Sequence, residues 1–159
     1  MLNCLSLIEP EVGYVQGMGY MCAILLVYMD KEVAFSIMLN LLNNKPYQIK
    51  DYYARDMIGL KLSFYILLSL IEKKLPKLHK HFLNEMVTPP HYATHWFMTL
   101  FSTKMPLELT LRIWDIFFIE GIKILYRVGL AILKLNEKVL LKSDFEGITT
   151  CLRTFLEES

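Results

Sequence analysis

The sequence from Asp56 to Lys74 reads DMIGLKLSFYILLSLIEKK. Apolar residues occupy most of the circumference of this segment when it is placed on an α-helix with 3.6 residues per turn. A helix that is apolar on most sides must be surrounded by other elements. We therefore predict a buried central helix here, at the centre of an all-α fold.

The segments on either side of this helix carry helical patterns of their own. Apolar residues recur at spacings of three and four over residues 16–29 and 31–43, and Asp30 is placed to cap the second segment. Because no alternating strand pattern competes, we predict a helical bundle-like array that forms a single domain over residues 1–159. Further helices are predicted over residues 94–101, 107–119 and 122–141. Pro106 would begin the second of these and Gly121 would end it. A last helix is predicted from a Ser143–Glu146 capping box to about Glu157.

Composition excludes several classes of protein. Lysine and arginine number 17 against 16 acidic residues, so a net charge of +1 creates no field that would favour nucleic acid. Cys4, Cys22 and Cys151 are far apart in apolar surroundings, which indicates reduced core residues and not a disulfide framework or a zinc motif. The longest apolar run, Tyr20 to Met29, is shorter than the roughly 20 residues that span a bilayer, and no secretory signal is recognised. We expect a cytoplasmic protein.

Three other patterns admit a functional interpretation. His91 and His95 are four residues apart, but Tyr92 stands where a zinc-protease helix needs glutamate, so we expect no metal site. The basic run from Lys73 to His81 could attract acidic lipid or a phosphoprotein, although a solvated basic turn is the preferred interpretation. Trp96 follows a loop and is a candidate for contact with a partner.

The stretch Gly13-Tyr14-Val15-Gln16-Gly17-Met18 places a polar amide between glycines, directly before an apolar helix. It resembles the Tyr-x-Gln-Gly-Met signature of TBC domains, the helical modules that accelerate GTP hydrolysis on Rab GTPases. Residues 112–121, RIWDIFFIEG, resemble the family's Arg-Ile-Trp-Asp helix, and Leu100-Phe101, Met105-Pro106-Leu107 and residues 41–46 fit the same pattern. The resemblance extends from about Leu2 to Leu156 and implies the C-terminal portion of a TBC domain. Gly19 departs from it, since many members have Asn there.

The resemblance implies chemistry on a partner protein. TBC domains supply an arginine and a glutamine in trans to a Rab GTPase in its GTP-bound form, and Gln16 matches the glutamine that helps to position the attacking water. GTP and Mg²⁺ would be carried by the GTPase, so no cofactor is expected on this chain. Tyr14, Val15 and Gly17, together with Trp96, are expected to contact the partner. Peripheral association with endomembranes, in vesicle trafficking, is expected only through that partner.

The family's arginine lies in an Ile-x-x-Asp-x-x-Arg motif before the glutamine, and residues 1–15 contain no such motif. Arg55 closes a similar pattern but follows Gln16, so it is not assigned the role. We expect residues 1–159 alone to be nearly inactive as a GTPase activator, and to self-associate if another helical lobe normally covers residues 14–29. The alternatives are a catalytically inactive Rab-binding module and a helical interaction scaffold.

Overall fold

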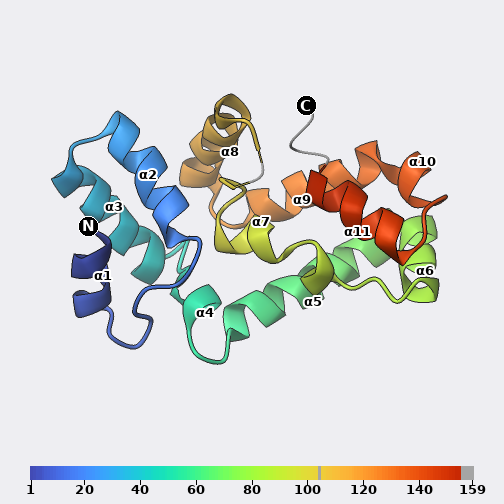
Figure 1. The fold of residues 1–159 in the computed structure, drawn as a ribbon, viewed down its shortest axis with the longest axis horizontal. Helices are drawn as coiled ribbons and strands as arrows, with labels where there is room; N and C mark the ends of the chain where they lie inside the picture. Colours follow the sequence, from blue (N-terminus) through green and yellow to red (C-terminus); the bar gives the residue numbers. More distant parts are fainter. Residues whose placement is uncertain (104, 155–159) are drawn as a thin grey trace.

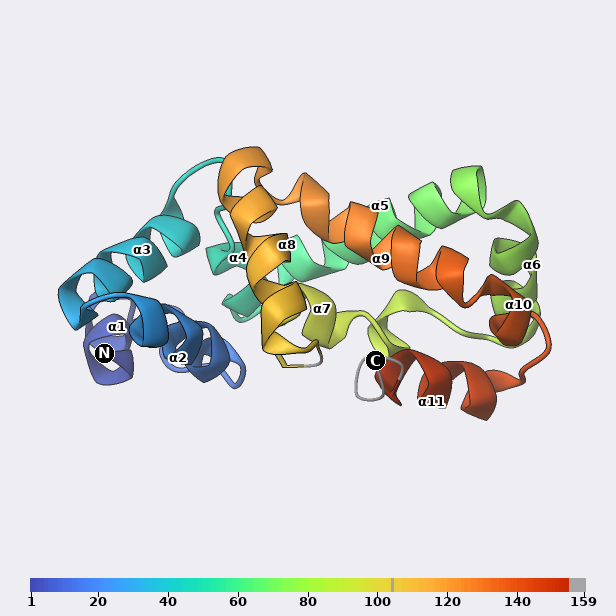
Figure 2. The same ribbon diagram turned by 90° about the horizontal axis from the view of Figure 1, so that it is seen from above.

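A computed structural model describes residues 1–103 and 105–154, and within these ranges it contains helices and connecting loops but no β-strand. The all-α prediction is confirmed. Figures 1 and 2 show an elongated array in which α1–α3 form one end. The elements are α1 (Leu2–Ile8), α2 (Met18–Tyr28), α3 (Lys31–Asn43), α4 (Lys50–Tyr53), α5 (Ile58–Lys74), α6 (Pro76–Asn84), the 3-10 helix η1 (Pro89–His91), α7 (Thr94–Met98), α8 (Leu107–Glu120), α9 (Lys123–Leu135), α10 (Glu137–Leu140) and α11 (Phe145–Thr154).

Helix α5 is the central element that its sequence predicts. It contacts α4, α6, η1, α7 and α9, and runs beside α9 along the long axis of the molecule (Figure 1). Leu60, Leu67 and Ile71 on α5 are buried in the core. The helix is nevertheless buried on one face only, contrary to the prediction, because Ile58, Leu62 and Tyr65 are 66%, 56% and 70% exposed. None of the helices in the described ranges is both long enough and apolar enough to cross a bilayer.

Two segments that are far apart in the sequence meet where α8 ends. The Tyr47 hydroxyl donates a hydrogen bond to the carbonyl oxygen of Phe118 at 2.6 Å, and its ring lies 5.1 Å from that of Phe117. Gly121, which follows α8, has φ 74° and ψ −158°, a backbone conformation that essentially only glycine adopts. A Cβ at this position would lie 2.9 Å from Pro46 Cβ and 3.1 Å from the Pro46 carbonyl oxygen. Backbone strain and a close approach therefore both require glycine here.

Replacing Gly121 by alanine is expected to lower the free energy of unfolding by about 2–4 kcal/mol, because it adds backbone strain and a clash with Pro46. Urea unfolding followed by circular dichroism measures this loss. Gly13→Ala is the control, since Gly13 also has positive φ, 65°, but a Cβ there meets nothing within 4 Å. We expect the control to cost about 1 kcal/mol, from backbone strain alone. Equal losses in the two variants would show that the contact with Pro46 is unimportant.

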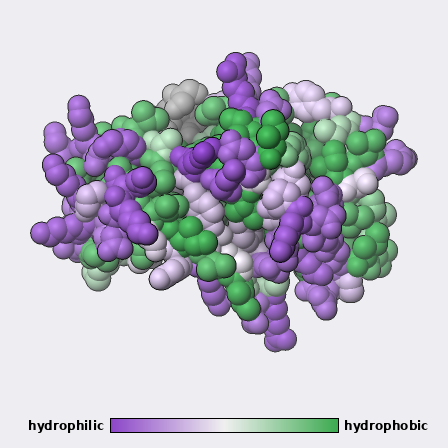
Figure 3. All heavy atoms as spheres, turned by 180° about the vertical axis from the view of Figure 1, so that it is seen from behind, coloured by the Kyte–Doolittle hydropathy of each residue, from purple (hydrophilic) through white to green (hydrophobic). Residues whose placement is uncertain are grey.

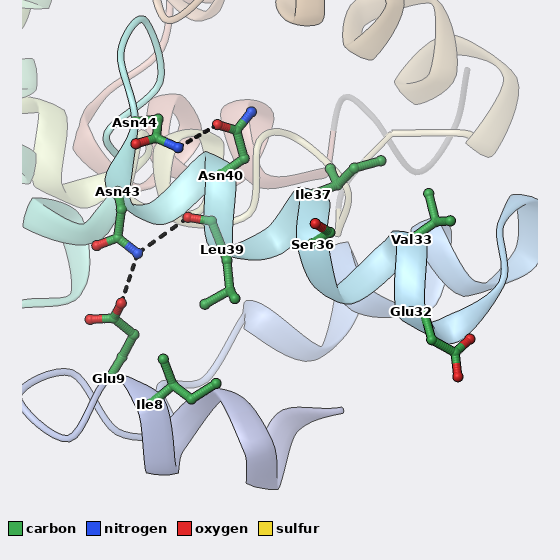
Figure 4. A pocket seen from close by; sticks show the side chains of 10 residues that line it. All are labelled: Ile8, Glu9, Glu32, Val33, Ser36, Ile37, Leu39, Asn40, Asn43 and Asn44. Atoms are coloured by element: carbon green, nitrogen blue, oxygen red, sulfur yellow. Dashed lines mark hydrogen bonds between the residues drawn. The ribbon is translucent and has the colours of Figure 1, made fainter.

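The buried carboxylate of Glu9 links the segment after α1 to α3 and α4. Glu9 is 9% exposed, and its carboxylate accepts a hydrogen bond from Asn43 Nδ2 at 2.7 Å (Figure 4). The carboxylate also lies 2.8 Å from Lys50 Nζ. The hydrogen bond from Lys50, then that from Asn43, holds the pKa of Glu9 below its usual value, and the same contact raises the pKa of Lys50. Both groups are charged near neutral pH.

These pKa shifts predict a pH dependence of stability. The contribution of Glu9 is present above its unfolded-state pKa of 4.5 and is lost as the pH falls through the lower folded-state value. Glu9→Gln is therefore expected to be less stable than the natural chain by about 1 kcal/mol at pH 7, with the difference closing in acid. Urea unfolding at a series of pH values tests this. Glu11→Gln is the control, because Glu11 is 83% exposed and lies 3.6 Å from Lys50 Nζ, and it should show little effect.

Several predicted boundaries are wrong. The helix predicted over residues 122–141 is divided at Asn136, whose Nδ2 donates to the Ile132 carbonyl oxygen at 2.8 Å. The predicted Ser143–Glu146 capping box does not form: Asp144 Oδ1 accepts the Gly147 amide at 2.9 Å, while the Ser143 hydroxyl donates back to Val139. The predicted helix end near Glu157 lies outside the described residues. Of the three cysteines, Cys4 is exposed and does not belong to the core.

Candidate functional site

Gln16 lies on a turn between the loop after α1 and the start of α2. The turn is closed by the Met18 amide, which donates to the Val15 carbonyl oxygen at 3.2 Å. The side chain of Gln16 is exposed. Its amide can therefore meet a group on another molecule, as a reactive role requires.

Gly17 fixes the position of this turn against α7. It has φ 112°, and a Cβ there would lie 3.1 Å from Thr99 Cγ2 and 3.6 Å from the Met98 carbonyl oxygen. Any other residue would face both backbone strain and the end of α7. The glycine that follows Gln16 is thus explained by the close packing of the turn.

The end of α7 that supports the turn is itself fixed by hydrogen bonds. The Tyr53 hydroxyl donates to the Met98 carbonyl oxygen at 2.5 Å, and the Thr99 hydroxyl donates to the His95 carbonyl oxygen at 2.7 Å. Tyr53 is 3% exposed, and its burial raises the pKa of its hydroxyl above the usual value, so it remains a donor. The turn therefore rests on a buried, hydrogen-bonded support.

A hollow of about 550 Å³ opens beside the amide, and we call it the Gln16 hollow. None of the ten described residues that line it carries a carboxylate, so a phosphate group could approach without repulsion from them. The lining residues are Val15, Gln16, Gly17, Tyr20, Met57, Thr94, His95, Met98, Thr99 and Thr103.

The structure brings together three of the predicted site residues, Val15, Gln16 and Gly17, around this hollow. Tyr14 does not line it, but Tyr14 is 61% exposed. The interpretation of Trp96 as a partner contact is wrong, because its side chain is only 2% exposed. It packs between Tyr92 and Phe101, with ring centroids 5.1 and 5.6 Å away, and so belongs to the core.

Seven of the ten lining residues were not predicted as site residues from the sequence: Tyr20, Met57, Thr94, His95, Met98, Thr99 and Thr103. Tyr20 projects from the first turn of α2, Met57 precedes α5, His95 lies on α7, and Thr103 follows α7. Only Tyr20 carries a local signal, because it lies four residues after Gln16 in the segment predicted to be helical from residue 16. Met57, His95 and Thr103 reach the hollow through tertiary packing that no local pattern records.

The two histidines considered as metal ligands lie in different elements. His91 ends η1, where its Nδ1 accepts the Thr88 amide at 3.1 Å and its ring packs 5.1 Å from that of Phe145. His95 is exposed on α7. They therefore do not share a helical face.

A larger hollow of about 900 Å³ lies between the end of α1 and the side of α3 (Figure 4). Several of its polar groups are already engaged with one another: Asn43 Nδ2 bridges the Glu9 carboxylate and the Leu39 carbonyl oxygen, and Asn44 donates to Asn40 Oδ1 at 2.7 Å. This network joins elements of the chain. The Gln16 hollow remains the better candidate.

Comparison with known proteins finds a family model and several relatives that match most of this chain. The family model described as the Rab-GTPase-TBC domain matches residues 1–141. The human ecotropic viral integration site 5 protein homolog is 37% identical over 147 residues, which cover 92% of this chain and 18% of that protein. The GTPase-activating protein GYP5 of Saccharomyces cerevisiae is 36% identical over 149 residues, covering 93% of this chain and 16% of that protein.

Among solved structures, the TBC domain of the Chlamydomonas flagellar RabGAP superposes with a TM-score of 0.85 at 33% sequence identity. The match covers 98% of this chain and 51% of that one. The chain thus spans less than one fifth of the length of these two curated relatives and about half of this solved domain.

Proposed function

Because the chain belongs to the Rab-GTPase-TBC domain family, we propose that it is part of a GTPase-activating protein and presents Gln16 to GTP bound by a Rab GTPase. The observation that carries this proposal is the position of Gln16: an exposed amide, on a turn fixed by Gly17, beside a hollow whose described lining residues carry no carboxylate. The GTPase carries the nucleotide and Mg²⁺, so this chain needs no cofactor of its own.

The chemistry of the amide suits this role. Its oxygen accepts a hydrogen bond from the attacking water, and its nitrogen donates to a phosphate oxygen or to the partner's backbone. Both interactions position reactants for phosphoryl transfer, a reaction whose catalysis consists largely of positioning and electrostatic stabilisation. The hydrogen-bonded end of α7 holds the turn in place, so little reorganisation is needed when the partner docks.

We further propose that the full rate requires an arginine supplied by another segment of the protein. Arginine fingers contribute on the order of 10³ to 10⁵ in rate, and no Ile-x-x-Asp-x-x-Arg motif precedes Gln16 within residues 1–159. These residues alone are expected to be nearly inactive. In the cell the whole protein would be cytoplasmic, peripheral on endomembranes, and would act in vesicle trafficking.

A panel of GTP-loaded Rab GTPases tests the proposal. GTP hydrolysis is measured with residues 1–159 and with a longer polypeptide that includes an arginine-bearing segment. The proposal predicts acceleration of at least one Rab by the longer form and little by the shorter. If the longer form binds a GTP-loaded Rab without accelerating hydrolysis, the chain is a Rab-binding module; if it binds none, it is a scaffold.

We also propose that residues 1–159 self-associate in isolation. Helices α2 and α3 expose large apolar side chains, among them Tyr20 at 55%, Val27 at 68%, Tyr28 at 56% and Val33 at 50%. Extended apolar surface of this kind tends to find a partner. Sedimentation at increasing concentration is expected to show dimers or larger species, and Val27→Lys should weaken them. A monomer at every concentration would contradict the proposal.

A further inference from the structure

Helix α6 carries a basic face at the opposite end of the molecule from α1–α3. Leu78 and Phe82 bury one side of the helix in the core. Lys77 and Lys80 lie on the other side and are exposed, together with Leu83, whose side chain is 60% exposed. The outer face of α6 therefore presents two cations beside a large apolar side chain.

The segment around α10 extends this face. His81 Nε2 on α6 lies 2.8 Å from the Ser143 carbonyl oxygen, so the chain after α10 is in direct contact with α6. Lys80 and Lys142 are each one residue from this contact, and both are exposed. Figures 1 and 2 both show α6 and α10 at the same end of the array.

We call this combined region the lysine surface. Its members share high exposure, and no ion pair joins any of its lysines to an acidic residue in the described part of the chain. Hydrophilic side chains gather at this end, which lies at the left in Figure 3. The lysines are Lys73, Lys74, Lys77, Lys80, Lys138 and Lys142, and the apolar side chains are Leu83 (60% exposed), Met86 (78%), Leu135 (77%) and Val139 (55%).

The acidic side chains near this surface do not neutralise it. Glu137 lies 2.6 Å from Lys134 Nζ and is engaged there. Glu72, Glu85 and Asp144 are the other carboxylates in residues 72–86 and 134–144, and Glu146 follows in the first turn of α11, so six lysines outnumber four acids that take no part in that ion pair. The surface is therefore cationic although the whole chain is almost neutral.

We propose that the lysine surface binds the anionic headgroups of a lipid bilayer. Clustered lysines are attracted to anionic lipid, and the exposed leucine and methionine side chains of the same segments can enter the headgroup layer. A nucleic acid fits less well, because residues 72–86 and 134–144 contain no arginine and their one aromatic side chain, Phe82, is buried. The protein would then contact membranes directly as well as through the partner GTPase. This inference does not depend on the role of Gln16.

Vesicle flotation of residues 1–159 tests the proposal, with phosphatidylcholine vesicles that contain or lack phosphatidylserine. Binding is expected only when phosphatidylserine is present, and it should weaken as salt screens the charges. Each lysine near the surface is expected to contribute about fivefold in affinity, so Lys77→Glu with Lys80→Glu should weaken binding by at least about 20-fold. Equal binding to both kinds of vesicle, or to neither, would overturn the proposal.

The matched control is Lys31→Glu with Lys61→Glu, which makes the same change in net charge at exposed positions outside the lysine surface. It is expected to lose much less affinity than the Lys77 and Lys80 variant. A second variant, Leu83→Ser with Leu135→Ser, keeps every charge and should lower the binding that survives at high salt. If the control weakens binding as much as the Lys77 and Lys80 variant, or if single-stranded RNA is bound and vesicles are not, the lysine surface is not a membrane site.

Discussion

Replacing Gln16 by alanine is expected to lower kcat/KM for GTP hydrolysis on the target Rab by about 10² to 10³, the usual effect of losing one positioned hydrogen-bonding group at a reacting centre. The side chain is exposed, so its removal should leave the fold intact. The measurement uses a polypeptide that also contains the arginine-bearing segment, because the loss can be seen only against an active background. Binding of the GTP-loaded Rab should change much less than turnover.

The variant Gln16→Glu changes the chemistry of the side chain while keeping its size and shape. A carboxylate of similar size accepts hydrogen bonds but, when ionised, donates none, and it places a negative charge beside the phosphates. We expect it to be at least as inactive as alanine. Gln48→Glu is the matched control, since it makes the same change at an exposed residue that does not line the Gln16 hollow, and its activity should be unaffected. Full activity of Gln16→Glu would show that the amide does not act on the water or the phosphate.

Local patterns predicted the fold class and the longest helices. The segment from Lys31 to Asn43 is helical as predicted, and the central helix begins at Ile58, two residues after the predicted start. Both helices have long apolar patterns bounded by clear breaks in the sequence. Their apolar patterns predict the buried face of each helix, but both helices also leave large apolar side chains exposed, such as Val33 and Tyr65.

Predicted helix boundaries were wrong where one residue is compatible with two local structures. The central helix ends at Lys74 as predicted, just before Pro76, but proline is also favoured in the first turn of a helix, and Pro76 starts α6, which was not predicted. Ser143 and Asp144 can both cap a helix, and the structure uses Asp144. Nothing in the local sequence distinguishes these alternatives, since tertiary contacts such as that between His81 and Ser143 decide between them.

The candidate site was predictable only at the residues of its motif. Gln16 and its neighbours were found because they resemble a family signature. His95 and Thr103 line the same hollow but are about 80 residues further along the chain, and their positions follow from the packing of α7 under the turn. Trp96 was misjudged for the same reason, because its burial depends on residues that its own neighbourhood does not include.

Replacing Trp96 by alanine is expected to lower the free energy of unfolding by about 3–5 kcal/mol, as for other large aromatic side chains in a protein core. The indole is stacked on Phe101 at 5.6 Å and packs against Tyr92. Helix α9 approaches it so closely that a Cβ on Gly129 would lie 3.2 Å from the ring. The neighbouring helices cannot all collapse into the space that alanine would leave, so a cavity should remain.

His95→Ala, at the residue directly before Trp96, is the matched control. His95 is exposed, so removing its side chain should change the free energy of unfolding by no more than about 0.5 kcal/mol. Urea unfolding of both variants, followed by circular dichroism, compares a core position with a surface position on the same short helix. The core assignment requires a large loss for Trp96→Ala and a small one for His95→Ala. If Trp96→Ala instead kept its stability and lost affinity for a GTP-loaded Rab, the indole would be a partner contact, and the packing of α7 against α9 would have to open when the partner binds.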